Sequence, residues 1–110
     1  MPFHGKGAVM LDLSGRIAFA STYFCDLVGV EHDKVARMSY LDFVFADDMH
    51  EAKKILEHDK SPRRAPFRLR LRRSDGAPVS VDVQCIALET ARGEVYAISV
   101  TITAVESLPN

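Results

Sequence analysis

The sequence predicts a single α+β domain in which two strands, a group of short helices, one longer helix and three further strands follow one another. Three observations support this order. Apolar residues alternate over 7–20, recur at helical spacing over 21–28 and 48–60, and alternate again in three segments over 67–105. With 110 residues, the chain is long enough for one hydrophobic core and too short for two.

The composition excludes several classes of protein. Apolar residues make up 47% of the chain and charged residues 26%, as in an ordinary globular protein. Fourteen Lys and Arg oppose fifteen Asp and Glu, so the net charge of −1 gives no overall attraction to nucleic acid or to an anionic membrane. No apolar run is long enough to span a bilayer, and the N-terminus lacks the hydrophobic core of a signal peptide. We therefore expect a cytoplasmic domain without membrane contact.

Residues 7–20 predict a first hairpin, because Ser14-Gly15 supplies a turn between two short apolar segments. Apolar residues alternate on both sides of this turn. We therefore expect Ile17 and Phe19 to lie on the same face.

Two helices are predicted from apolar residues at helical spacing and from residues that favour helix ends. The first is capped by Ser21 or Thr22 and ends at Gly29. The second begins at Asp48, with Glu51 three residues later as in a capping box. Its apolar stripe consists of Met49, Ala52, Ile55 and Leu56.

The stretch FRLRLRRSDGAPVSVDV predicts a second hairpin around a loop at 74–76. In this register, apolar side chains face one another on one side of the two strands, in the pairs Phe67–Val83, Leu69–Val81 and Leu71–Val79. Arg68 lies opposite Asp82 on the other side, which also carries Arg70 and Arg72. We expect these arginines to face away from the helices, and we expect Arg70→Ala to change stability little.

A local basic patch accompanies this hairpin, since six of the fourteen basic residues lie between Arg63 and Arg73. Nucleic-acid-binding surfaces usually add stacking aromatic side chains or a basic helix. Phe67, the only aromatic residue nearby, is expected to point inward. We therefore expect no binding to nucleic acid.

The last strand presents two different faces. One face is strongly apolar and is expected to point inward, with Tyr96, Ile98, Val100 and Ile102. The opposite face is small and weakly polar, with Val95, Ala97, Ser99 and Thr101. This second face, together with the N-terminal residues 1–7, is the expected contact of a homodimer.

No arrangement of residues indicates catalysis or a metal site. The sequence has no Ser or Cys nucleophile with a nearby His and carboxylate, no glycine-rich phosphate loop, and no His and Cys cluster at metal-ligand spacing. Asp47 and Asp48 are explained by their position at a helix start. Cys25 and Cys85 lie in apolar segments and are expected to be two buried thiols. We expect the domain not to be an enzyme.

The order of these motifs resembles that of a PAS domain over residues 7–106, with residues 1–6 and 107–110 as flanks. The resemblance rests on GRIAFAS leading into FCDLVG, FADD opening the main helix, FRLRLRRSDGAPVSVDV, and a closing ISVTITAVE. It implies a five-stranded antiparallel sheet with short helices packed on one face, around a small cavity where family members hold flavin, haem, metabolites or nothing. It also implies a sensory or dimerising module attached to histidine kinases of two-component systems, diguanylate cyclases or transcription factors.

The resemblance can be compared with two cofactor-binding subgroups. The LOV subgroup, which binds flavin and senses light, looks like Asn-Cys-Arg-Phe-Leu-Gln in the helix before the main one, where this chain has RMSYLDFV. Ser39 or Tyr40 stands where the photoactive cysteine belongs, so a LOV photosensor is not expected. Haem-binding members use a His of the main helix, and His50 and His58 are available. Since His50 lies among charged residues near the helix start, haem is also not expected.

If a small ligand binds, the resemblance places it between the inner sheet face and the helices. Tyr40 or Tyr96 would then offer the polar group that contacts it. The expected pocket residues are Leu11, Phe24, Leu27, Tyr40, Phe43, Ile55, Leu69, Val81, Val83, Ile98 and Val100.

The leading hypothesis is a sensory or regulatory module that binds a small ligand or a partner and relays the change to an attached or separate effector domain. The alternative is a purely structural dimerisation module without a ligand, whose core is filled by Phe24, Phe43, Phe67, Leu69 and Tyr96. A void too small for a few heavy atoms would exclude the ligand. A small enzyme of similar shape would need convergent polar groups inside the pocket. We expect residues 1–110 to be an excised or truncated input domain, or one that acts by binding another chain.

Overall fold

The computed structural model describes residues 6–56 and 66–105, which form one antiparallel sheet and a series of short helical segments. The strand order in the sheet is β2-β1-β5-β4-β3. The strands are β1 (Gly7–Leu11), β2 (Ile17–Ala20), β3 (Phe67–Arg72), β4 (Pro78–Glu89) and β5 (Val95–Ala104). The helical segments are α1 (Thr22–Val28), α2 (His32–Val35), η1 (Tyr40–Phe43), η2 (Ala46–Asp48), α3 (Met49–Lys53) and η3 (Lys54–Leu56). The predicted α+β fold with a five-stranded antiparallel sheet is confirmed.

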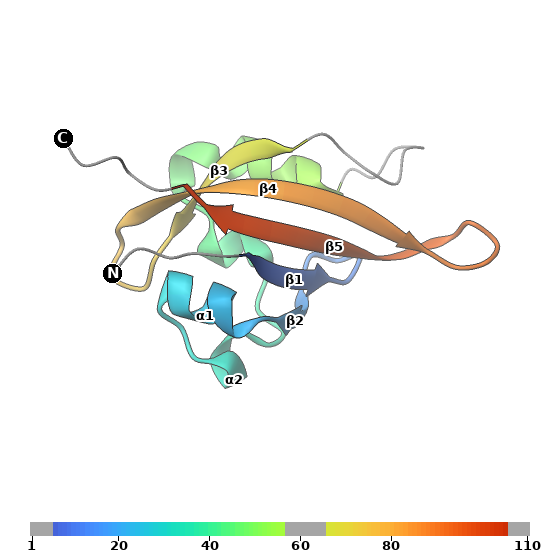
Figure 1. Ribbon diagram of the computed structural model, residues 1–110, viewed down its shortest axis with the longest axis horizontal. Coiled ribbons are helices and arrows are strands. Elements are labelled where there is room, and N and C mark those ends of the chain that lie inside the picture. Colours follow the sequence, from blue (N-terminus) through green and yellow to red (C-terminus); the bar gives the residue numbers. More distant parts are fainter. Residues whose placement is uncertain (1–5, 57–65, 106–110) are drawn as a thin grey trace.

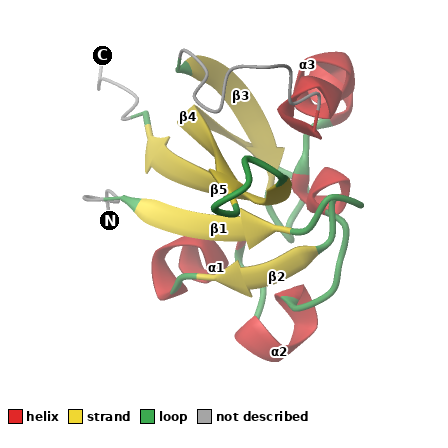
Figure 2. Ribbon diagram, turned by 90° about the vertical axis from the view of Figure 1, so that its right-hand side faces the viewer, coloured by secondary structure: helices red, strands yellow, loops and turns green. Residues whose placement is uncertain are grey.

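The helical segments cover one face of the sheet, which we call the inner face; the opposite face is the outer face. In Figure 1 the green segments from η1 to η3 lie behind β3 and β4, while α1 and α2 lie beside β1 and β2. Figure 2 shows the same arrangement from the side, with α3 next to β3 and α2 next to β2. The β4–β5 hairpin extends beyond the other strands at one end. Only the part of the sheet under the helical segments therefore contributes to a core.

Among the described residues, the core between these layers consists of hydrophobic side chains, with Tyr40 and two cysteines included, and no charged side chain is buried. Burial of this apolar surface is the main favourable contribution to folding. The sheet contributes Val9, Leu11, Ile17, Ala20, Leu69, Leu71, Val81, Val83, Cys85, Ile98, Val100 and Ile102. The helical segments and their connections contribute Phe24, Cys25, Leu27, Val28, Val35, Tyr40, Phe43, Val44, Ala52 and Ile55.

A bulge in the first hairpin reverses the expected alternation. Met10 pairs with Phe19 and Leu11 pairs with Ile17, so Ala18 has no partner in the ladder. Ile17 is therefore buried, while the Phe19 side chain is 56% exposed on the outer face. The prediction that Ile17 and Phe19 share a face is wrong, because an extra residue between them shifts the alternation.

Helix α1 begins and ends at the predicted residues. The Ser21 hydroxyl accepts a hydrogen bond from the Phe24 N–H at 3.4 Å, which caps the first turn. Gly29 follows the helix with a φ of 75°, a left-handed conformation that glycine adopts at lower energy than other residues because it lacks a Cβ atom.

The second predicted helix begins differently from the expected capping box. Helix α3 starts at Met49 and continues into η3, but Asp48 makes no side-chain capping bond at its start. Residues 57–60, the rest of the predicted helix, lie outside the described residues. The predicted apolar stripe is confirmed, since its members are buried or packed against the core. The Asp48 carboxylate instead binds Arg70, so the capping prediction is wrong.

The β3–β4 hairpin has the predicted register. Leu69 pairs with Val81 and Leu71 with Val79, and Leu69 and Leu71 are buried on the inner face. Arg68 lies opposite Asp82, and its Nε donates to the Asp82 carboxylate at 3.2 Å. The alternation of the sequence therefore predicted which face of β3 is buried.

Arg70 departs from this pattern, because its side chain reaches the helical layer around the edge of β3. Its Nη2 and Nε lie 2.7 Å and 3.1 Å from the two oxygens of Asp48, and its backbone N–H donates to the same carboxylate at 2.8 Å. The guanidinium also lies 5.1 Å from the centre of the Phe45 ring. The expectation that Arg70 faces away from the helices is wrong, and so is the basis for expecting Arg70→Ala to be neutral.

A second bulge lies near the start of β5. Leu88 pairs with Ala97 and Glu89 pairs with Val95, so Tyr96 is left unpaired in the ladder. Its side chain is 56% exposed. The prediction that Tyr96 points into the core is wrong, because the bulge turns it outward on the projecting hairpin.

Replacing Leu69 by Ala is expected to lower the free energy of unfolding by about 2–5 kcal/mol, because it leaves a void in the buried inner face. The Arg68→Ala variant, at the adjacent residue on the exposed side of the same strand, should cost about 0.5 kcal/mol or less. Urea unfolding of both variants measures the difference. Equal losses would contradict the observed division between the two faces of β3.

Replacing Asp48 by Asn is expected to destabilise the protein at neutral pH, because Arg70 loses its charged partner. Hydrogen bonds from the Arg70 side chain hold the pKa of Asp48 below its ordinary value of 3.8. The stabilisation by Asp48 is therefore fully present above that value, and it is lost as the pH falls through the lowered pKa. Urea midpoints of wild type and variant should differ at pH 7 and converge in strong acid.

The adjacent Asp47→Asn variant is the control. Asp47 is exposed, and its replacement by Asn also removes one acidic charge. A loss in this control as large as that in Asp48→Asn would contradict a specific role for the bond between Asp48 and Arg70.

Candidate functional site

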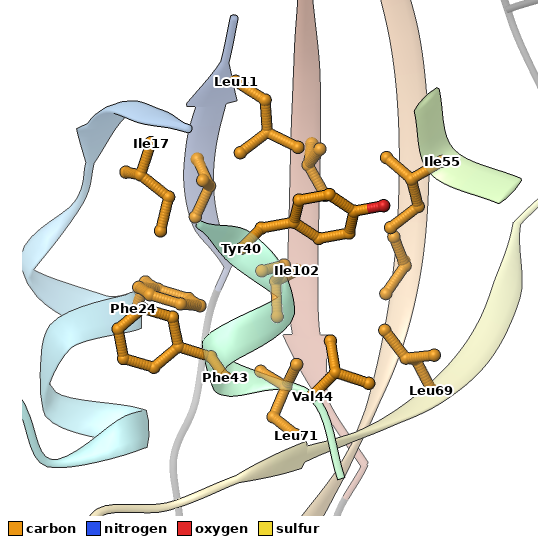
Figure 3. A pocket seen from close by; sticks show the side chains of 13 residues that line it. Leu11, Ile17, Phe24, Tyr40, Phe43, Val44, Ile55, Leu69, Leu71 and Ile102 are labelled. Carbon is orange, nitrogen blue, oxygen red and sulfur yellow. The ribbon is translucent and has the colours of Figure 1, made fainter. Parts of the chain in front are cut away.

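A small cavity lies in the core between the inner sheet face and the helical segments. Its volume is about 30 Å³, and its lining presents only apolar atoms. Figure 3 shows the side chains of the 13 residues that line it, all of which are buried. They are Val9, Leu11, Ile17, Phe24, Tyr40, Phe43, Val44, Ile55, Leu69, Leu71, Val83, Val100 and Ile102.

Two aromatic rings take up much of the space beside this cavity. Phe24 comes from α1 and Phe43 from η1, and their ring centres lie 5.6 Å apart in an edge-to-face arrangement. This geometry is favourable for aromatic pairs and adds to the energy of burial. Figure 3 shows the two rings side by side below Tyr40. The pair thus joins two helical segments directly over the sheet.

Tyr40 forms another part of the cavity wall. Its hydroxyl donates a 2.7 Å hydrogen bond to the carbonyl oxygen of Ala52, and this bond is buried. A Cβ atom at Gly15 would lie 3.1 Å from the Tyr40 ring, so the turn at Gly15 closes tightly over the ring. The bond to Ala52 fixes η1 against α3, and it directs the Tyr40 hydroxyl to the protein backbone.

Most residues of the predicted pocket lie around the cavity. Those that line it are Leu11, Phe24, Tyr40, Phe43, Ile55, Leu69, Val83 and Val100. Leu27, Val81 and Ile98 are buried in the core but do not line it. The prediction omitted Val9, Ile17, Val44, Leu71 and Ile102. The omitted strand residues could have been predicted, because they alternate with predicted residues such as Leu11, Leu69 and Val100. No local pattern indicated Val44, which pairs with Leu71 as an isolated bridge.

The cavity does not fit flavin or haem. A volume of about 30 Å³ holds about two water-sized groups, far less than either cofactor needs. His50, one of the two predicted haem-ligand candidates, is exposed on α3 and does not line the cavity. His58, the other candidate, lies outside the described residues.

The cysteines are also away from the cavity wall. Cys25 on α1 and Cys85 on β4 are both buried thiols, as predicted, and neither lines the cavity. Burial raises the pKa of the Cys25 thiol, so this residue is a poor nucleophile. At the position of the LOV cysteine, Ser39 accepts a hydrogen bond from the Leu41 N–H at 3.2 Å.

The arginines of β3 are engaged with the protein itself. Arg68 binds Asp82 and Arg70 binds Asp48, as described above. The Arg72 Nη2 donates to the carbonyl oxygen of Asp42 in η1 at 2.9 Å, so the expectation that Arg72 faces away from the helical segments is also wrong. Each arginine of β3 therefore binds a group of the protein itself.

The outer face carries a row of uncharged side chains across four strands. Ile86 of β4 lies opposite Ser99 of β5, Ser99 opposite Met10 of β1, and Met10 opposite Phe19 of β2. We call these four residues the outer row. Phe19 is exposed and the other three are half-buried, so the row is open to contact.

A metal site and a membrane-spanning helix are both absent from the described ranges. Within residues 6–56 and 66–105, no group of three or more His, Cys, Asp or Glu side chains is arranged to hold a metal ion. In the same part of the chain, no helix has the length and apolar composition that a membrane crossing requires.

Comparison with solved structures shows the fold of related domains. The chain is similar to the PAS domain of an HTR-like protein from Haloarcula marismortui, with 22% identity, a TM-score of 0.76, and coverage of 91% of this chain and 81% of that one. The chain is also similar to a PAS domain from Colwellia psychrerythraea, with 13% identity and a TM-score of 0.81; the match covers 91% of this chain and 86% of that one. A PAS domain from a two-component sensor histidine kinase has 15% identity to the chain and a TM-score of 0.73; this match covers 91% of this chain and 85% of that one.

Comparison with curated proteins gives no significant match. The profile of the PAS domain family, in contrast, matches residues 6–105. This match spans all five strands and all the helical segments of the fold. The chain therefore belongs to the PAS domain family.

Proposed function

We propose that the chain is a regulatory PAS module of a signal-transduction protein, that its own side chains fill its core, and that it acts through contact with another protein surface. The cavity carries this proposal, because its volume of about 30 Å³ is too small for a flavin, a haem or a metabolite of several heavy atoms. The alternative of a filled dimerisation module is therefore favoured over a preformed ligand site.

The general role follows from the family. PAS domains are generally sensory or regulatory modules rather than enzymes, and one domain similar to this chain comes from a two-component sensor histidine kinase. The interior supports a non-enzymatic role, since its cavity presents no polar group to a substrate. In our proposal, the module is cytoplasmic and passes its signal to an attached or separate effector domain.

The cavity limits the size of any small ligand that could bind in the core. Without movement of the walls, the cavity admits an apolar molecule of about two heavy atoms. A larger ligand must displace Phe24 or Phe43, and it then loses their edge-to-face contact. The Tyr40 hydroxyl already donates to Ala52, so contact with a ligand through this donor would break a buried bond.

A second copy of this chain is the partner that we propose for the outer face. The outer row is uncharged, so two copies can meet across it without burying a charge. Exposed Phe19 offers an aromatic side chain of the kind that anchors protein interfaces. Of the predicted contact residues, Ser99 and Thr101 lie half-buried on this same face of β5, whereas Ala97 is buried and Val95 precedes the bulge. Residues 1–5 of the predicted contact lie outside the described residues. Nucleic acid is not proposed as a partner, because the arginines of β3 bind groups of the protein itself.

Replacing Phe43 by Ala tests whether the protein's own side chains fill the core. The change should cost about 3–5 kcal/mol and open a void beside the cavity. Benzene should then raise the unfolding temperature of this variant, while the wild type shows no shift. Phe19→Ala is the matched control, since Phe19 is exposed and its removal opens no void.

The wild-type measurement alone decides the question if Phe43→Ala fails to fold. A benzene-induced rise in the unfolding temperature of the wild type, of the size expected for a preformed pocket, would contradict the proposal of a filled core.

Placing an arginine in the outer row tests the proposed dimer. Light scattering over a concentration series should show a dimer for the wild type at high micromolar concentration and a monomer for Ser99→Arg, because two added charges would face each other. Ala91→Arg, in the exposed loop between β4 and β5, should leave the dimer intact. A wild type that stays monomeric throughout the series would overturn self-association of this chain.

A further inference from the structure

Tyr23 of α1 joins the N-terminal end of β1 to the C-terminal end of β5. Its hydroxyl accepts a 3.0 Å hydrogen bond from the backbone N–H of Ala104, a residue 81 positions away in the chain. Ala104 is the last residue of β5, and its register partner on the other side is Val81 of β4. The side chain of a helical residue thus satisfies a backbone donor at the end of a central strand.

The Tyr23 ring also lies directly against Gly7, the first residue of β1. A Cβ atom at Gly7 would come within 2.6 Å of the ring carbon Cδ1, which is closer than atoms can approach. Gly7 pairs with Ile102 of β5, two residues before Ala104. The ring therefore packs where β1 begins and β5 ends, and glycine is needed there to admit it.

The same short helix is fixed to β1 and to the cavity. The Ser21 N–H donates to the Ala8 carbonyl at 2.9 Å, and the Ala8 N–H donates to the Ser21 hydroxyl at 3.0 Å. Phe24, the next residue after Tyr23, lines the cavity and contacts Phe43. A shift of α1 that changes the Phe24 contact must therefore also move the Tyr23 hydroxyl relative to Ala104.

We infer that Tyr23 is a latch that couples the position of α1 to the C-terminal end of β5. While its hydroxyl holds the Ala104 N–H, the side of the β5 end that extends past β1 is protected. When α1 shifts, the bond breaks and this side of the β5 end opens, although the end keeps its pairing with β4. The inference goes beyond the proposed function, because it assigns a conformational device to the fold and does not depend on the identity of the partner.

Amide hydrogen exchange in the Tyr23→Phe variant tests the latch directly. This variant removes only the hydroxyl, so the Ala104 amide should exchange roughly two- to tenfold faster, the change expected from the loss of one hydrogen bond. The Val100 amide in the centre of β5 should report only the global stability. Tyr96→Phe is the matched control, since the same atom is removed from an exposed side chain on the same strand.

Gly7→Ala provides a second approach that leaves the hydroxyl in place. The added Cβ must push the Tyr23 ring aside, so exchange at Ala104 should again accelerate. An Ala104 amide that keeps its wild-type exchange rate in Tyr23→Phe overturns the inference. An equal acceleration in Tyr96→Phe overturns it as well.

The coupling to α1 is tested by combining Tyr23→Phe with Phe24→Leu. Phe24→Leu loosens the contact of α1 with Phe43 and should accelerate exchange at Ala104 when Tyr23 is intact. In the Tyr23→Phe background, the same change should add little, because the latch is already open. Fully additive effects on the Ala104 rate would show that α1 acts on β5 by another route, and would overturn the coupling.

Discussion

The edge-to-face contact between Phe24 and Phe43 is the interaction on which the rest of the structure depends. It joins α1 to η1 over the apolar inner face of the sheet, with 5.6 Å between the ring centres. The two rings form part of the cavity wall, and the free space left beside them is only about 30 Å³. The bond from the Tyr40 hydroxyl to Ala52 then holds η1 against α3, so the walls of this space are fixed from both sides. A cofactor would have to separate these contacts before it could enter.

Because the interior has little free space, the surface and the strand ends are the parts of the domain that can contact other segments or proteins. The helical segments cover the inner face, while the outer face remains open and carries an uncharged row from Ile86 to Phe19. At one end of the sheet, Tyr23 connects α1 to both β1 and β5. Changes in packing around Phe24 can therefore reach the end of β5 without a ligand-sized cavity.

Much of the fold could be predicted because its apolar pattern is local and regular. The alternation around the loop at 74–76 fixed the register of β3 and β4, down to the pair of Arg68 with Asp82. The cap at Ser21 and the left-handed Gly29 were predictable for the same reason, since both depend on neighbouring residues. Most of the cavity wall followed from this alternation, because strand residues of one parity share the inner face.

The errors arise where distant parts of the chain decide the outcome. Bulges at Ala18 and Tyr96 change the parity of β2 and β5, and no turn or glycine in the sequence marks them. Asp48 was predicted to cap a helix, but its carboxylate instead accepts two hydrogen bonds from the side chain of Arg70 on β3. Val44 lines the cavity through a single bridge to Leu71, a contact that local periodicity cannot indicate.

Native mass spectrometry of the protein purified from its own host, combined with its absorption spectrum, tests the central claim most directly. A core filled by Phe24 and Phe43 predicts the mass of the polypeptide alone and no absorption in the visible range. A retained flavin, haem or metabolite of several heavy atoms, seen as added mass that disappears on unfolding, would contradict a filled core and restore a ligand-binding interior.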